Sequence, residues 1–484
     1  MSSDDIPPRD LPFAPFGLVD RGLDAYRGRR VLMLQGPIGP FFARLARDLR
    51  AVGAHVVKID FNAGDRLFSH RASFDAVEAY RGTMTSWPKA FERLVTRHDV
   101  DVVLLFGDSR PVHLPAIKAA QRMGVDIGVF EEGYLRPDYI TVERNGVNKH
   151  SPLPRDPAYY RGLAVQGSTP AVPLGSTFGR AAMWGMLYCT AASLGWRQFP
   201  FHEYHRALTW RECRYWMRSG WRKLRYRITE RPTEARFIGP DPVRFFLVAL
   251  QTRGDAQVRI HSPFQTVERF IEHVMREFAE HAPAGVELAL KHHPLDRGFS
   301  DHRRLIEHLA DELGIRDRCH YLHDQHLPTL LGRCEGLVTI NSTVGLSAVG
   351  EGVPVAVCGD AIYHIPGLTY QGRLADFWNE APRFRPDSAL WTAFREVLVS
   401  TTQVNGSFYR RHPGAGNATG VFWNKHRQAE LRGDTPVTAR TLRPWLQALP
   451  AKVPELAGHH PPDARRPAKA SDALRPHERL SLPQ

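Results

Sequence analysis

A repeated alternation of apolar strands and amphipathic helices is the feature that most constrains how this chain can fold. The first half contains the strand-like runs RRVLMLQG, AHVVKIDFN, DVDVVLLFGD and VDIGVFEEG. After the first run, FFARLARDLRAVG places Phe42, Leu45 and Leu49 at helical spacing. Apolar strands separated by helices indicate a parallel sheet covered on both faces, whose ligands bind beyond the carboxyl ends of the strands.

The same pattern restarts after about residue 240, with the runs VRFFLVALQ, VELALKHHP, EGLVTINST and VPVAVCGD. Between them, TVERFIEHVMREF places a set of apolar residues on one helical face: Val267, Phe270, Ile271, Val274 and Phe278. Two such halves resemble the two-lobed glycosyltransferase arrangement called GT-B. We therefore predict an α/β fold of two Rossmann-like lobes with the site in the cleft between them. Two unrelated Rossmann domains would show the same periodicity.

The expected division of the chain follows from these patterns. An N-terminal extension (1–28) precedes the first lobe (29–165), a helical insert rich in basic and aromatic residues (166–235) and the second lobe (236–395). A C-terminal helical region (396–450) and a tail (451–484) follow. The tail is rich in Pro, Ala, Arg and His, and we expect it to be disordered.

A basic amphipathic helix is predicted within the insert, from Trp210 onward. Its apolar stripe consists of Cys213, Met217, Trp221, Leu224 and Ile228, and its basic stripe of Arg211, Arg214, Arg218, Arg222 and Arg225. Two interpretations remain open. The apolar stripe packs on the lobes and the arginines face solvent, or the helix docks on a membrane.

The formal charge of +13 and the isoelectric point near 9.7 favour an anionic partner: nucleic acid, a phosphorylated substrate or an acidic membrane surface. No nucleic-acid-binding motif is recognised, so we expect no nucleic acid partner. Five scattered cysteines without a CxxC pair fit a reducing compartment. The N-terminus lacks a basic-then-apolar signal sequence. The apolar run at 181–196 is shorter than the roughly 20 residues of a membrane span, so we expect a soluble or peripherally attached protein.

Three loops at predicted strand ends of the first half carry candidate site residues. In LQGPIGPFF, Gly36 and Gly39 would let the backbone approach a ligand, although a plain turn before a helix is the alternative. In VFEEGYLRPDYIT, Glu131 and Glu132 are either an acid/base at a strand tip or part of a solvated turn. The same loops, with FGDSR, add further substrate-binding candidates: Gln35, Asp108 and Arg136.

Two loops of the second half could hold a phosphate. In KHHPLDRG, Lys291, His292 and His293 follow a strand and supply cationic or donor groups. A metal site is not expected, because adjacent histidines diverge on a strand and no third ligand has suitable spacing. In TINSTVGLSAVGEG, a further set stands at a probable helix start: Asn341, Ser342 and Thr343. Such residues bind phosphate or simply cap the helix.

A third carboxylate, Asp255, stands just past the first strand of the second half, in LQTRGDAQVRIHSPF. It would face Glu131 and Glu132 across a cleft if the lobes close. Two carboxylates that flank a glycosidic carbon can act as nucleophile and acid/base. An aspartate in a turn is the alternative.

Together, these ordered motifs closely resemble the KpsS/LipB family of capsule biosynthesis proteins, formerly described as capsule export proteins. The resemblance runs from LQGPIGPFF through FNAGDR, FGDSRPVH, FEEGYLRPDYITVE, GVNKHSPLPRDP, ALKHHPLDRG, TINSTVGLSA and GLTYQG to TTQVN, over about residues 29–410. It implies a retaining β-Kdo transferase that moves 3-deoxy-D-manno-octulosonic acid (Kdo) from CMP-β-Kdo to lyso-phosphatidylglycerol. That reaction starts the poly-Kdo linker of a Gram-negative capsular polysaccharide.

The same resemblance implies roles for residues. His293 with Ser342 and Thr343 would hold the CMP phosphate, Glu132 would be the acid/base and Asp255 the nucleophile. No metal or other cofactor is implied. The protein would lie in the cytoplasm, on the inner face of the inner membrane, where other capsule assembly proteins are possible partners. The first lobe would bind the acceptor and the second the CMP-sugar.

Two rival functions come from other classes. A sugar-nucleotide epimerase of the same fold would bring carboxylates and histidines into a cleft, but would need no lipid-facing helix. A non-enzymatic export or scaffold protein would use the basic stripe and leave the cleft inert.

Overall fold

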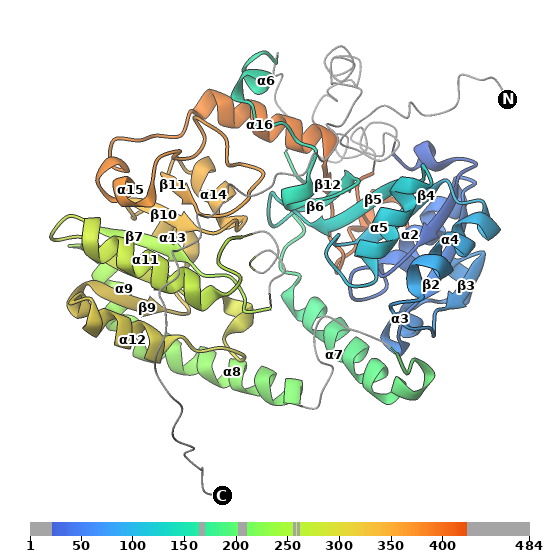
Figure 1. The fold of residues 1–484 in the computed structure, drawn as a ribbon, viewed down its shortest axis with the longest axis horizontal. Coiled ribbons are helices and arrows are strands. Elements are labelled where there is room, and N and C mark those ends of the chain that lie inside the picture. Colours follow the sequence, from blue (N-terminus) through green and yellow to red (C-terminus); the bar gives the residue numbers. More distant parts are fainter. Residues whose placement is uncertain (1–21, 164–169, 202–210, 255–257, 259–261, 424–484) are drawn as a thin grey trace, which may run out of the picture.

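The computed structural model describes residues 22–163, 170–201, 211–254, 258 and 262–423. The described chain forms two α/β lobes, each built around its own sheet (Figure 1). The N-terminal lobe has a seven-stranded sheet of order β12-β6-β5-β4-β1-β2-β3, and the C-terminal lobe a five-stranded sheet of order β11-β10-β7-β8-β9. The predicted class, two Rossmann-like lobes of the GT-B type, is confirmed.

Five parallel strands form most of the N-terminal sheet: β1 (Arg30–Met33), β2 (His55–Asp60), β3 (Ala76–Ala79), β4 (Val102–Phe106) and β5 (Asp126–Glu132). Both faces are buried, because Val31 and Met33 of β1 pack into one core and Leu32 into the other. This explains why apolar residues predominate in these strands. The connecting elements are η3 (Gly22–Tyr26), α2 (Phe41–Ala51), α3 (Ala63–Phe68), η4 (Arg71–Ser73), α4 (Trp87–His98) and α5 (His113–Arg122).

The C-terminal sheet is parallel throughout, with strands β7 (Phe245–Ala249), β8 (Glu287–Lys291), β9 (Cys319–Leu322), β10 (Gly336–Thr339) and β11 (Val355–Val357). The longest helix between its strands, α11 (Val267–His281), buries the apolar face predicted from its spacing. The Thr266 side chain caps this helix by accepting a bond from the Arg269 amide. The other elements are η7 (Pro294–Asp296), α12 (Arg303–Glu312), η8 (Arg316–Arg318), α13 (Leu327–Leu331), α14 (Val344–Gly350) and α15 (Leu374–Glu380).

The chain returns to the N-terminal lobe after the second sheet. Helix α16 (Ser388–Thr401) leads to β12 (Gln403–Asn405), which pairs antiparallel with β6 (Tyr139–Arg144). Beyond it, near η9 (Pro413–Ala415), Phe408 and Trp423 enter the N-terminal core. This differs from the helical region expected over 396–450, because the edge of β6 accepts a strand there. Residues 424–450 and the predicted tail lie outside the described residues.

The insert supplies one long helix to each lobe. Helix α7 (Phe178–Leu194) and η6 (Trp196–Gln198) lie against α3 of the N-terminal lobe, whereas α8 (Arg211–Thr229) and α9 (Arg231–Ile238) lie along the C-terminal lobe (Figure 1). Two shorter elements precede them, η5 (Asn148–His150) and α6 (Pro157–Arg161). Among the described residues, no helix has the length and apolar character that a membrane crossing requires.

The orientation of α8 contradicts one of the two interpretations of its apolar and basic stripes. Arg218 donates to the carbonyl of Gly298, and Arg222 donates to the carbonyls of Arg297 and Ser300. Four residues of the apolar stripe are instead 59–69% exposed: Met217, Trp221, Leu224 and Ile228. The prediction of a packed apolar stripe was wrong, because α8 packs instead through Ser219, Tyr226 and the bonds of Arg222 to the 297–300 loop. Three arginines of the basic stripe are exposed, as that interpretation expected: Arg214, Arg218 and Arg225.

Candidate active site

Three loops meet at the carboxyl edge of the N-terminal sheet. Strands β1, β4 and β5 are neighbours, so the segments that follow them lie together. The half-buried Arg110, after β4, joins the loops by donating to Gln35 Oε1 at 3.3 Å and to the Gly36 carbonyl at 3.1 Å. Sequence reasoning missed Arg110, although it lies in the FGDSR motif, two residues after a proposed site residue.

Glu131 lies in the middle of this group and is partly buried. Its Oε1 accepts a hydrogen bond from the Glu132 amide at 2.9 Å. Burial raises the pKa of Glu131 to about 7; the charges of Glu132 and Asp108 also raise it, whereas the amide bond and Arg110 lower it. A carboxyl group with a pKa near neutrality can both hold and release a proton at working pH, as acid/base catalysis requires.

Glu132, the last residue of β5, has a different environment, since consecutive strand residues point to opposite faces. Its Oε1 accepts a hydrogen bond from the Tyr409 hydroxyl at 3.0 Å. Burial raises the pKa of Tyr409, so this hydroxyl keeps its proton. Tyr409 follows β12 and was not predicted, because no local pattern links it to a strand 277 residues away.

Asp108 is buried and has partners for both carboxylate oxygens. Oδ1 accepts from Ser109 Oγ at 2.8 Å, and Oδ2 from the Val147 amide at 3.1 Å and His150 Nδ1 at 3.0 Å. Burial raises its pKa, but the bonds from His150, Val147 and Ser109 outweigh burial and lower it. In this structure Asp108 therefore holds two loops together.

The two predicted glycines meet packing requirements. A Cβ on Gly36 would lie 2.7 Å from Cγ of Phe42, and Gly39 has a φ of +112° and lies against Trp184. The buried Gln35 amide donates to Asp65 Oδ2 at 3.1 Å. Arg136 is exposed, with its Nε donating to the Gly133 carbonyl at 3.2 Å.

The HHP loop after β8 divides its three polar residues between the lobe interior and the surface. Lys291 is buried, and Nζ donates to the His323 carbonyl at 3.0 Å. Burial lowers its pKa to about 8. His292 is also buried, 2.6 Å from the Tyr321 hydroxyl, and burial lowers its pKa to about 2, so the ring is neutral. His293 is partly buried, and its Nδ1 accepts from the Leu295 amide at 3.2 Å, which places the proton of the neutral ring on Nε2.

The loop after β10 is tied to the loop after β7. Gln251 Nε2 donates to Asn341 Oδ1 at 3.0 Å. Ser342 Oγ accepts from the Val344 amide at 3.3 Å, at the start of α14, whereas the Thr343 side chain makes no capping bond. In the strand order β10-β7-β8, one strand separates the Ser342–Thr343 loop from the HHP loop, and both lie at the carboxyl edge of the sheet. Asp255 lies outside the described residues.

A buried carboxylate from the insert supports the C-terminal loops. Glu230 accepts from the His323 amide at 3.0 Å and from His323 Nδ1 at 2.5 Å, and Tyr226 stacks on the His323 ring. Burial raises the pKa of Glu230, but the bonds to His323 outweigh burial and lower it. Because Lys291 bonds the carbonyl of His323, the insert helps to position the HHP loop.

The lobes touch through the segment that follows β6. Lys149 forms an ion pair with Asp360 at 2.9 Å, and Arg155 donates to the Ile362 carbonyl at 2.5 Å. Asp360 and Ile362 follow β11, at the carboxyl edge of the C-terminal sheet. Within the described residues, no group of three or more His, Cys, Asp or Glu side chains could hold a metal ion.

The chain also matches a known protein family. Residues 101–409 match the model of the family described as capsule polysaccharide biosynthesis protein, and this chain belongs to that family. The match includes the Glu131–Glu132, HHP and Ser342–Thr343 loops.

Two curated relatives are similar to this chain over most of its length. The chain is 41% identical over 390 residues to the capsule polysaccharide export protein KpsS of Escherichia coli, covering 79% of this chain and 97% of that protein. It is 39% identical over 385 residues to the capsule polysaccharide modification protein LipB of Neisseria meningitidis serogroup A, covering 78% and 91%. A solved structure, the β-Kdo 2,7 transferase KpsC of Thermosulfurimonas dismutans, aligns with a TM-score of 0.36 and 14% identity, covering 73% of this chain and 92% of that one.

Proposed function

We propose that this protein is a retaining glycosyltransferase that moves Kdo from CMP-β-Kdo to lyso-phosphatidylglycerol and so starts a capsular poly-Kdo linker. The observation that carries the proposal is the position of two groups of residues. Glu131 and Glu132 lie at the carboxyl edge of the N-terminal sheet, and the His293 and Ser342–Thr343 loops lie at the carboxyl edge of the C-terminal sheet. This arrangement occurs in a chain that belongs to the capsule polysaccharide biosynthesis family. The identities of donor and acceptor come from the KpsS/LipB resemblance.

In this proposal, the C-terminal lobe binds the CMP phosphate. His293 donates from Nε2, and the hydroxyls of Ser342 and Thr343 add further donors. Lys291 contributes positive charge from behind the loop, because its Nζ already bonds the His323 carbonyl. Together these groups offset the charge of the departing CMP, so the chemistry does not require a metal ion.

Retention is proposed to arise from two displacements. The Asp255 carboxylate forms a bond to the anomeric carbon of Kdo as the bond to the CMP phosphate oxygen breaks, and CMP leaves with the electron pair. An acceptor hydroxyl then attacks the same carbon, displaces Asp255 and gives its proton to the Glu131–Glu132 pair. Tyr409 orients Glu132 for this step.

The proposed setting is the cytoplasmic face of the inner membrane, with the protein bound peripherally beside other capsule assembly proteins. The support is the net charge of +13 together with the exposed apolar stripe of α8. A lipid acceptor with one acyl chain would be presented at that surface.

The test is direct. The full chain is incubated with a CMP-Kdo-generating system and a fluorescent lyso-phosphatidylglycerol, and the lipid is examined for a mass gain of one Kdo. Glu132→Gln is the matched control. A lipid of unchanged mass, with a folded protein that still binds CMP, would overturn transfer and favour an export role like the one for which the KpsS relative is named.

A further inference from the structure

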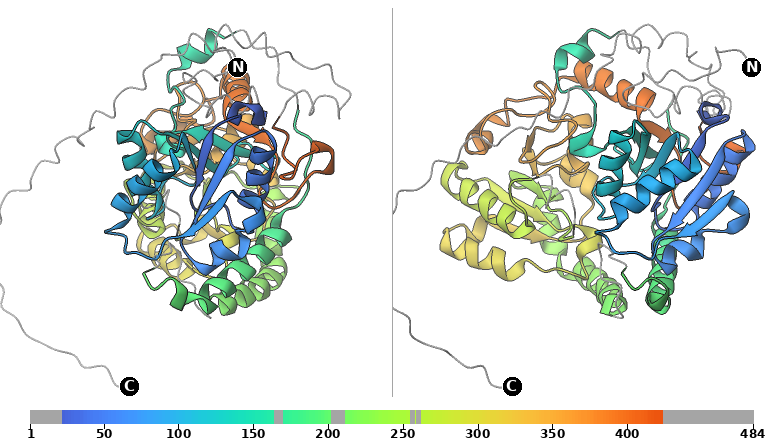
Figure 2. Two further views of the ribbon diagram at one scale, coloured as in Figure 1. Left: turned by 90° about the vertical axis from the view of Figure 1, so that its right-hand side faces the viewer. Right: turned by 45° about the vertical axis from the view of Figure 1, so that its right-hand side comes forward.

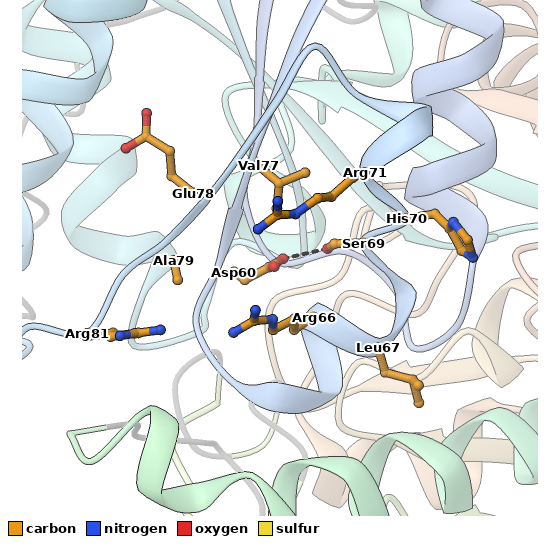
Figure 3. Close-up of a pocket in the computed structure, with 10 residues that line it drawn as sticks. All are labelled: Asp60, Arg66, Leu67, Ser69, His70, Arg71, Val77, Glu78, Ala79 and Arg81. Atoms are coloured by element: carbon orange, nitrogen blue, oxygen red, sulfur yellow. Dashed lines mark hydrogen bonds between the residues drawn. The ribbon is translucent and has the colours of Figure 1, made fainter.

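A hollow of about 530 Å³ lies at the carboxyl ends of β2 and β3, away from the candidate active site (Figure 3). Asp60 and Ser69 are buried within it, and Val77 forms part of its wall. Its exposed lining includes Arg66, Leu67, His70, Arg71 and Arg81. In Figure 3 the guanidinium groups of the three arginines point toward this hollow from different sides.

The charge of this hollow is poorly balanced by the protein itself. Within the described part of the chain, the side chains of Arg71 and Arg81 have neither a hydrogen bond nor an ion pair. The nearby Glu78 is bound to Arg97 and His98. Guanidinium groups that share one hollow repel each other, and a phosphate bound between them would relieve that repulsion through paired N–H donors.

The other carboxylate of the hollow, Asp60, opposes an anion but is itself largely offset. It accepts a hydrogen bond from Ser69 Oγ at 2.5 Å and lies 3.4 Å from Lys58 Nζ. Burial raises its pKa, while Lys58 and Ser69 lower it. At the floor of the hollow, Asp60 and Ser69 could accept hydrogen bonds from hydroxyl groups carried by a phosphate ester.

An apolar helix borders the hollow. Helix α7 packs on α3, and Arg66 Nη1 bonds Gln198 of η6 at 3.2 Å. Among the 17 residues of α7 the only charged one is Arg180, yet its buried residues are only Tyr188 and Ala192. The exposed apolar side chains of α7 and of the segment that follows it include Phe178, Met183, Met186, Leu187, Leu194, Trp196 and Phe201. A helix that is apolar on all sides normally lies in a protein core or in a membrane.

Helix α8, which carries the exposed apolar stripe, lies on the same side of the molecule. Both helices lie along the lower side in Figure 1 and remain on that side in both views of Figure 2. Basic residues surround the stripe, since Lys223, Arg225 and Arg227 are exposed, and Arg225 lies over the Trp221 ring. Aromatic and aliphatic side chains bordered by arginines fit the interface of an anionic bilayer.

We propose that α7, α8 and the arginine hollow form one docking surface for an anionic phospholipid bilayer, with the hollow holding a lipid head-group phosphate. A second copy of the chain is a poor occupant, because each copy carries a net charge of +13. The lipid in the hollow is not the reacting acceptor. Strand β2 is three places from β5 in the sheet, about 14 Å at ordinary strand spacing, so a head group in the hollow lies away from Glu132.

This inference goes beyond the proposed function, because it assigns a lipid site separate from the acceptor and holds whether or not Kdo is transferred. One such helix on each lobe would hold both lobes against a single plane. The sheet edges that carry the candidate active site would then keep a constant height above the head groups.

The test measures sedimentation of the full-length protein with vesicles of phosphatidylcholine alone or mixed with phosphatidylglycerol. Arg71→Ala/Arg81→Ala should weaken binding to the mixed vesicles about tenfold or more, since each arginine near an anionic surface contributes appreciably. The control Arg93→Ala/Arg122→Ala removes the same charge from α4 and α5 and should bind nearly as the wild type does. Equal losses of vesicle binding in both double variants would show that binding depends only on net charge and would overturn the head-group site.

Three further measurements test the proposal. Leu194→Ser/Trp196→Ser, at side chains 82% and 61% exposed, should lower vesicle binding without changing the melting temperature or CMP affinity. Calorimetry with glycerol phosphate tests whether the hollow binds a free phosphate ester instead of a lipid in a bilayer. Tight binding of glycerol phosphate without vesicle binding overturns docking. Self-association in light scattering that Leu194→Ser/Trp196→Ser abolishes would instead make this face an interface between copies, which also overturns docking.

Discussion

The Tyr409 hydroxyl lies 3.0 Å from Oε1 of Glu132, across 277 residues of chain. The contact exists because β12 returns from the second lobe to pair with β6, whose other neighbour is β5, the strand that ends in Glu132. The end of the described chain thus helps to build the site of the first lobe. Truncation before β12 would remove this part of the site.

Tyr409→Phe should therefore lower kcat by about 10-fold or more, because a hydrogen bond to a charged group contributes about 1.5–3 kcal/mol. The KM for CMP-Kdo should change little, since Tyr409 acts through Glu132. Steady-state kinetics measures both values. Tyr80→Phe, which removes a hydroxyl that bonds the Thr83 carbonyl, is the matched control. A rise in KM with unchanged kcat would contradict a positioning role.

The raised pKa of Glu131 predicts that the difference in stability between the wild type and Glu131→Gln depends on pH. The folded state keeps this carboxyl protonated up to about pH 7, whereas the unfolded chain releases the proton near pH 4.5. The contribution of Glu131 to stability is complete below the unfolded pKa and is lost as pH rises through the folded pKa. Relative to the wild type, Glu131→Gln should thus gain up to about 3 kcal/mol in unfolding free energy between pH 4 and pH 8. Urea unfolding at the two pH values measures this; a difference independent of pH would contradict the raised pKa.

His293→Ala should weaken CMP binding by about 1–3 kcal/mol, the scale for a lost hydrogen bond to a charged group. Isothermal calorimetry measures the affinity. His308→Ala, at an exposed position of α12, is the control and should bind CMP as the wild type does. Unchanged affinity in His293→Ala would remove this histidine from the donor site.

Glu132→Gln should slow transfer by about 10² to 10⁴-fold, the usual contribution of a positioned acid/base group. If the second displacement is slowed, the covalent intermediate should accumulate. Intact-protein mass spectrometry of Glu132→Gln with CMP-Kdo should then show a Kdo adduct that peptide mapping places on Asp255. Absence of the adduct, with near-normal turnover in Asp255→Asn, would favour front-face transfer without a nucleophile.

The contacts of Arg222 predict that this arginine stabilises the fold. Arg222→Ala should lower the unfolding free energy by about 1–3 kcal/mol, because it leaves the carbonyls of Arg297 and Ser300 without their donor. Arg225→Ala, at an exposed arginine that lies over Trp221, should change it by no more than about 0.5 kcal/mol. Chemical denaturation compares the two. Equal effects would show that Arg222 does not anchor the helix.

The strands that carry the candidate site could be located from the sequence, because buried parallel strands are continuous apolar runs. Glu131–Glu132, His293 and Ser342–Thr343 end such runs, and parallel strands place their carboxyl ends on one edge. The apolar face of α11 was equally readable from its period. Strand β9, by contrast, has only one fully buried residue, Leu322, and so lacked the apolar signal.

The sequence by itself thus determined the two-lobe class and the strand ends at which polar residues gather, since both follow from local periodicity. Only the tertiary structure decided which groups meet there. Tyr409 reaches Glu132 through a strand pairing between distant segments, and Arg110 reaches Gln35 because β4 lies beside β1. It also decided which face of α8 is exposed: both stripes have helical spacing, and the bonds of Arg218 and Arg222 to carbonyls of the 297–300 loop leave the apolar stripe on the outside.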